Sequence, residues 1–108
     1  MVGLVACGGD DGTAAAPDPD ADVAIIATDN HFDQPSYTAP AGEVSFSYVE
    51  QGRIPHTLLI EDVDDFKLEV RPSDEVDDGS VTLTPGTYLL YCDVPGHRPS
   101  MEAELVVR

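Results

Sequence analysis

Apolar and polar side chains alternate with a period of two over most of the chain from residue 22 onward. Val44, Phe46 and Tyr48 alternate with Ser45 and Ser47, and successive side chains of a β-strand point to opposite faces. This period predicts strands with one buried face. Similar patterns occur in segments 23–27, 56–60, 66–71, 81–83, 88–92 and 101–107, and another short strand is expected near residue 37.

Turn sequences separate these segments, and no segment carries a helical period. Pro40-Ala41-Gly42 and Thr84-Pro85-Gly86-Thr87 are typical turns, while residues 61–65 predict an acidic turn and residues 72–79 a charged loop. The pattern predicts an all-β fold, a Greek-key β-sandwich of about seven to eight short strands. Residues 22–108 are expected to form this single domain.

The first 21 residues differ in composition and predict a separate segment. They are rich in Gly, Ala, Pro and Asp, and so small an apolar content predicts disorder. Leu4-Val5-Ala6-Cys7-Gly8-Gly9 resembles a bacterial lipobox, which implies a lipidated Cys7, a linker over 10–21 and an extracytoplasmic location in the cell envelope. The alternative is an unmodified cysteine in a mobile tail.

The net charge of −16, from 21 acidic and 5 basic residues, restricts the partners. Nucleic acids and anionic membrane surfaces repel such a chain, so neither is expected as a partner. The acidity predicts a redox or docking partner with a basic face, or adaptation to a salty medium. It does not distinguish the two.

Chemistry is concentrated between Tyr91 and Met101, where a thiol, an imidazole and a thioether lie within ten residues. Cys92 ends a strand whose Tyr88 and Leu90 share its face. His56 begins a strand, and the period of two places it on the same face as the core residues Leu58 and Ile60. Soft sulfur with imidazole and a weak axial Met selects copper and suits one-electron transfer.

Each candidate ligand also has a plainer interpretation. An inward Cys or His is often only a core residue, and a lone Met is usually packing. One Cys and two His also satisfy a zinc site, although structural zinc prefers more cysteines and Met is a poor fourth ligand for it. His31, in a polar loop, is predicted to be a solvated surface residue.

The chain resembles the cupredoxins, the type 1 (blue) copper proteins, over residues 22–108. The resemblance lies in the Tyr-Cys-x-Val-Pro-Gly-His run and the preceding Pro-Gly-Thr-Tyr turn. The Cys-x4-His-x3-Met spacing is similar to that of azurins, and the acidic domain behind a lipobox-like Cys resembles halocyanin-like and plastocyanin-like envelope cupredoxins. The resemblance implies one copper ion held by His56, Cys92, His97 and Met101.

The resemblance also implies roles at the metal site for two further residues. The family often has Asn after the first His, where its side chain ties the ligand loops together. Here the residue is Thr57, which is expected to make one such bond but not the pair that an amide makes. The carbonyl of Pro55, directly before His56, is a possible additional ligand.

The resemblance implies a carrier of single electrons, cycling between Cu(I) and Cu(II), that meets its partners through an apolar patch around His97. The expected patch residues are Val94, Pro95, Pro99, Ile54 and Pro55. The alternative is copper storage or delivery, against which the small number of Met and His residues counts. Only His31 is left beyond the ligand set, too few for a catalytic copper site, so no enzyme activity is expected. A monomer is expected.

Overall fold

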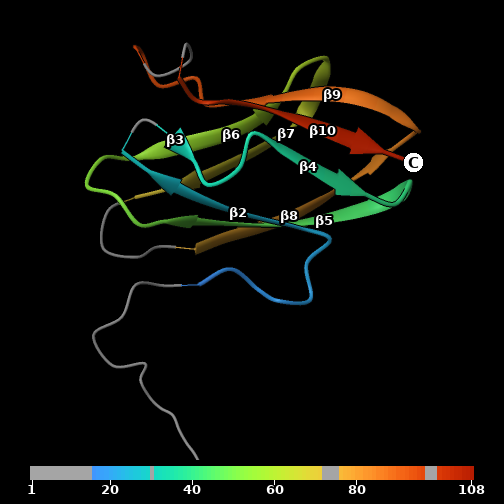
Figure 1. Cartoon of the computed structure of the whole chain (residues 1–108), viewed down its shortest axis with the longest axis horizontal. Coiled ribbons are helices and arrows are strands. Elements are labelled where there is room, and N and C mark those ends of the chain that lie inside the picture. The colour runs from blue at the N-terminus through green and yellow to red at the C-terminus, as the bar shows by residue number, and fades with distance from the viewer. Residues whose placement is uncertain (1–15, 30, 72–75, 97–99) are drawn as a thin grey trace, which may run out of the picture.

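The computed structural model describes residues 16–29, 31–71, 76–96 and 100–108, and these ranges form two packed β-sheets (Figure 1). They contain no helix of the length and hydrophobicity that a membrane crossing requires. The strands are β2 (Val23–Thr28), β3 (His31–Phe32), β4 (Ser36–Ala39), β5 (Gly42–Glu50), β6 (His56–Ile60), β7 (Val63–Val70), β8 (Val76–Leu83), β9 (Gly86–Tyr91) and β10 (Glu102–Val107).

The chain crosses between the two sheets rather than completing one before starting the other. One sheet has the order β4-β10-β9-β6-β7 and the other the order β3-β2-β5-β8. The pairs β10–β4 and β2–β5 are parallel, and the remaining pairs are antiparallel. The predicted all-β sandwich is confirmed.

Strand boundaries differ from the expectation in two acidic segments. β7 begins at Val63, inside the predicted acidic turn, and β8 begins at Val76, inside the predicted charged loop. β8 pairs along β5, with Val49 opposite Val76 and Ser47 opposite Asp78. Residues 76–80 of this strand are exposed or half-buried, and the core contacts come only from Val81 and Leu83 near its end, so the hydrophobic period was weak at its start. With the two-residue β3, the described residues form nine strands.

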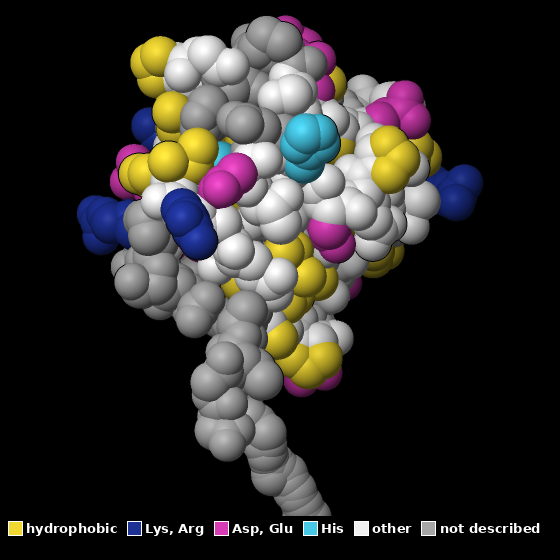
Figure 2. Space-filling model, turned by 60° about the vertical axis from the view of Figure 1, so that its left-hand side comes forward, with side chains coloured by type: hydrophobic (Ala, Val, Ile, Leu, Met, Phe, Trp, Pro, Cys, Tyr) yellow, Lys and Arg dark blue, Asp and Glu magenta, His cyan; other side chains and the backbone are white. Residues whose placement is uncertain are grey.

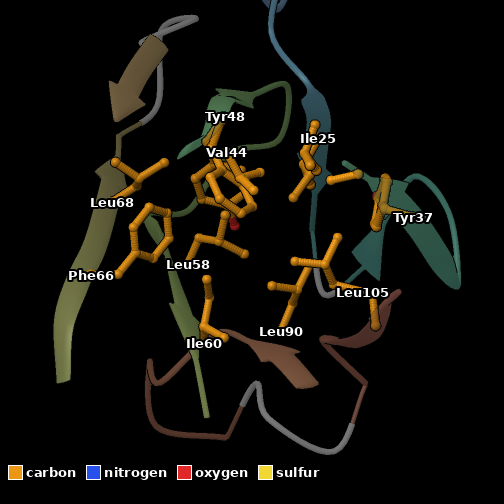
Figure 3. Close-up of a cluster of buried hydrophobic side chains, with 14 of the residues drawn as sticks. Ile25, Tyr37, Val44, Tyr48, Leu58, Ile60, Phe66, Leu68, Leu90 and Leu105 are labelled. Atoms are coloured by element: carbon orange, nitrogen blue, oxygen red, sulfur yellow. The ribbon is translucent and has the colours of Figure 1, made fainter. Parts of the chain in front are cut away.

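The core lies between the sheets and contains the apolar positions that the period of two indicated (Figure 3). Val44 and Tyr48 from β5 face Leu58 from β6 and Leu90 from β9, and all four are buried. The rings of Phe46 and Phe66 lie 4.7 Å apart between centroids. Burying apolar area of this kind is the main force that holds two sheets together.

The residues just before β2 hydrogen-bond to β5. The backbone N–H of Asp18 donates to Ser47 Oγ, and that of Asp22 donates to Ser45 Oγ, each at 2.9 Å. The domain boundary after residue 21 and the lipidation of Cys7 remain predictions, and Cys7 lies outside the described residues.

One hydrogen bond joins the two sheets beside the start of β6. The hydroxyl of Tyr48 donates to the carbonyl of Thr57 at 3.0 Å inside the core, and burial raises the pKa of Tyr48 well above its usual value. A buried carbonyl that loses a hydrogen-bond donor is costly. This bond therefore holds the strand that carries His56 against the opposite sheet.

We expect Tyr48→Phe to lower the free energy of unfolding by about 1–2 kcal/mol, because it leaves the Thr57 carbonyl without this donor. Urea unfolding would measure the change. Tyr88→Phe is the matched control, since the Tyr88 hydroxyl donates to the Thr84 carbonyl at an exposed position, where water can replace it. An equal loss in both variants would contradict the assignment.

Candidate metal centre

Three of the four predicted ligands lie in the described part of the chain, each at the end of a strand. His56 is the first residue of β6, Cys92 follows β9, and Met101 precedes β10. Their exposed fractions are 1%, 0% and 0%. His97 lies outside the described residues.

The backbone fixes the two ends of the ligand loop. The Cys92 N–H donates to the Met101 carbonyl at 3.2 Å, which continues the β9–β10 pairing by one step beyond Tyr91 and Glu102. Between these ends, Gly96 has a φ of +85°, a left-handed conformation that glycine adopts without strain. The two sulfur-bearing residues are therefore held as neighbours by the sheet itself.

His56 and Cys92 lie at a distance that a single metal ion can span. His56 Nδ1 is 4.0 Å from Cys92 Sγ. Bonds from a metal such as zinc run about 2.0–2.1 Å to histidine nitrogen and about 2.3 Å to cysteine sulfur, a sum slightly above this separation. Cys92 and Met101 belong to the buried core cluster, and His56 is buried as well. The nitrogen, thiol and thioether donors fit a soft transition metal.

Thr57 ties the His56 strand to the Cys92 loop more fully than expected. Its backbone N–H donates to Cys92 Sγ at 3.4 Å. Its hydroxyl donates to Asp93 Oδ1 at 2.7 Å and accepts the Asp93 N–H at 2.9 Å. The expectation of one side-chain bond was wrong, because a hydroxyl both donates and accepts.

Glu50, a carboxylate buried beside His56, was not among the residues predicted from the sequence. Glu50 is 0% exposed, and its Oε1 lies 3.7 Å from His56 Nε2. Its Oε2 accepts the Gly52 N–H at 2.6 Å. Burial raises the pKa of Glu50, while the nearby His56 and the Gly52 N–H act in the opposite direction. The signal was present, since Glu50 continues the inward series Val44-Phe46-Tyr48 in β5.

Asp29 completes a small group of possible metal ligands with Glu50 and His56. One ligand atom from each of these residues lies within 4.8 Å of the others. Asp29 is exposed, and its Oδ1 accepts the Arg53 N–H at 2.7 Å. His56 belongs both to this group and to the predicted copper ligands. Its Nε2 lies near Glu50, and its Nδ1 lies near Cys92.

Apolar residues lie next to the strand ends that carry His56 and Cys92. Pro55 and Pro95 are exposed, and Ile54 and Val94 are half-buried. These are four of the five expected patch residues, but their relation to His97 stays a prediction. Figure 2 shows acidic side chains distributed among hydrophobic ones on one face of the molecule, without a single acidic block. His31 is exposed, as predicted.

We expect Thr57→Val to lower the free energy of unfolding by about 1–2 kcal/mol, because both hydroxyl bonds to Asp93 are lost while the volume stays similar. The Cys92 thiol should also react faster with a thiol reagent, since the loop that follows it is no longer tied to β6. Thr38→Val, at an exposed position of β4, is the control. Unchanged stability and reactivity would contradict a structural role for the hydroxyl.

No protein-family model matches the chain, and no curated protein is similar to it at a significant level. Among solved structures, the fold is similar to that of sodium-dithionite-reduced auracyanin from the photosynthetic bacterium Roseiflexus castenholzii. The TM-score is 0.70 with 18% sequence identity, over 80% of this chain and 95% of that one. The chain therefore has a cupredoxin-like β-sandwich fold.

Proposed function

We propose that this domain binds one copper ion through His56, Cys92, His97 and Met101 and carries single electrons between redox partners. The observation that supports it best is the 4.0 Å separation of His56 Nδ1 and Cys92 Sγ, both buried. Copper bound there would supply a one-electron couple between Cu(I) and Cu(II). The cupredoxin-like fold is consistent with this use.

The protein contributes a rigid arrangement of the metal ligands. The sheet bond between Cys92 and Met101 and the Thr57 bonds to Cys92 and Asp93 connect three of the ligand positions. A donor set that is already in place changes little between two oxidation states, which favours fast electron transfer. The Thr57 N–H also stabilises negative charge on Cys92 Sγ, and a metal-bound thiol is deprotonated.

Storage or delivery of copper is the alternative. A carrier of copper ions needs ligands that release the metal readily, whereas three of the proposed donors are buried and cross-linked by hydrogen bonds. The structure therefore favours electron transfer over transfer of the ion. Reversible voltammetry together with slow copper loss to a strong chelator would distinguish the two functions.

We further propose a cellular location and a class of redox partner for the domain. A lipid at Cys7 would tether it outside the cytoplasm, in the cell envelope, with residues 10–21 as the linker. A partner with a basic face would be attracted by the net charge of −16, and its association would slow as salt screens that attraction. The exposed Pro55 and Pro95 would belong to the contact surface.

One equivalent of Cu(II) added to the metal-free protein should produce an intense absorption band at about 600 nm, from thiolate-to-copper charge transfer at Cys92. Cys92→Ser should abolish this band, because an alkoxide or hydroxyl is not a soft donor. The visible spectrum is the measurement. A folded, reduced wild-type protein without the band would contradict the proposal and favour zinc or no metal.

His97→Gly should give the band only when imidazole is supplied from outside, because the small ligand then replaces the missing side chain. The spectrum is recorded with and without imidazole. His31→Gly, which removes an exposed histidine, is the control and should behave as wild type. A normal spectrum of His97→Gly without imidazole would remove His97 from the ligand set.

A further inference from the structure

Glu50 is a buried carboxylate. It is the last residue of β5 and lies beside His56, the first residue of β6. The side chains of Glu50 and His56 are both fully buried. Burying a carboxylate is costly unless hydrogen bonds or an opposite charge compensate for it. A residue with this cost next to a candidate ligand is expected to act on that ligand.

The turn between β5 and β6 fixes the orientation of the carboxylate. Oε2 of Glu50 accepts the Gly52 N–H at 2.6 Å. A Cβ on Gly52 would lie 2.8 Å from this same oxygen and closer still to Asp29 Oδ1, so only glycine allows the approach. The other oxygen, Oε1, has no hydrogen-bond donor among the described residues and lies 3.7 Å from His56 Nε2.

The two ring nitrogens of His56 therefore face different groups. Nδ1 faces Cys92 Sγ at 4.0 Å, and Nε2 faces Glu50 Oε1 at 3.7 Å. The second distance exceeds that of a hydrogen bond, so the contact is electrostatic as it stands. The group opposite one nitrogen of a histidine decides which nitrogen carries the proton and which can bind a metal.

We propose that Glu50 is the positioning residue of the metal centre. Its carboxylate holds the proton of His56 on Nε2, which leaves the lone pair of Nδ1 directed toward Cys92. An acceptor at Nε2 also makes Nδ1 a stronger donor to a metal, as carboxylates behind metal-binding histidines generally do. This inference rests on the proposed function and adds a residue to its site.

A metal ion between Asp29, Glu50 and His56 is the competing interpretation. Glu50 and Asp29 each accept a backbone N–H from the turn, at Gly52 and Arg53 respectively, so one oxygen of each carboxylate is already bound to the protein. Such a site would also need Nε2 of His56 as a ligand, and the proposed copper uses Nδ1 of the same ring. The observations favour the positioning role.

The first measurement uses the metal-free full chain. Long-range proton–nitrogen NMR reports the His56 tautomer, which should be protonated at Nε2 in the wild type. Glu50→Met introduces a flexible apolar side chain of similar size and removes the acceptor, so this preference should be lost. Glu50→Gln keeps an acceptor and should retain it.

The second measurement uses copper. Glu50→Met should weaken Cu(II) binding by about 10–100-fold, the usual effect of losing a residue that supports a ligand. Glu50→Gln should raise the reduction potential, because an amide oxygen is a weaker acceptor behind His56 Nε2 than a carboxyl group. Glu43→Met and Glu43→Gln are matched controls, since Glu43 lies on the same strand and is exposed. Both should resemble the wild type.

Three results would overturn the inference. In the first, His56 in Glu50→Met remains protonated at Nε2 and binds Cu(II) as the Glu43→Met control does. In the second, which decides the question if Glu50→Met fails to fold, Glu50→Gln has the potential of Glu43→Gln. In the third, the wild type binds two ions and the Glu50 variants bind one. A wild type without the copper band contradicts the proposed function instead, and the tautomer measurement still tests Glu50.

Discussion

The hydrogen bonds of one residue, Thr57, connect the parts on which the site depends. Its carbonyl accepts the Tyr48 hydroxyl from the opposite sheet, and its N–H and hydroxyl reach Cys92 and Asp93. Core packing brings the two sheets together, but apolar contacts are not directional and do not prevent one sheet from sliding slightly over the other. Directional bonds from a single residue remove those movements, so His56 and Cys92 keep their separation.

The sequence was sufficient for most of the fold because burial follows a period of two in strands such as β2, β4, β7 and β10. Val44, Phe46 and Tyr48 are buried as that period requires, and so is His56. The sequence joined Cys92 and Met101 only through their spacing as candidate ligands, and the pairing of β9 with β10 makes them neighbours in the structure. The fold class and the inward direction of three ligands follow from these local rules.

The same rules could not predict contacts that depend on side-chain geometry. Thr57 bonds to Asp93, 36 residues later, and no local pattern specifies this pair. Glu50 lies at an inward position, but average behaviour places glutamate in solvent, so its burial becomes apparent only with the turn at Gly52. The start of β8 was missed because its first residues pair with β5 but bury little side-chain surface.

The acidic start of β8 has a consequence for how copies of the molecule meet. β8 is the last strand in the order of its sheet, and such an edge presents backbone groups to which another chain could add a strand. Asp77 and Asp78 lie in this edge strand, in a molecule whose net charge is −16. Two such edges repel each other before their backbones can pair. The composition that made this strand difficult to recognise therefore protects the sheet against growth into an aggregate.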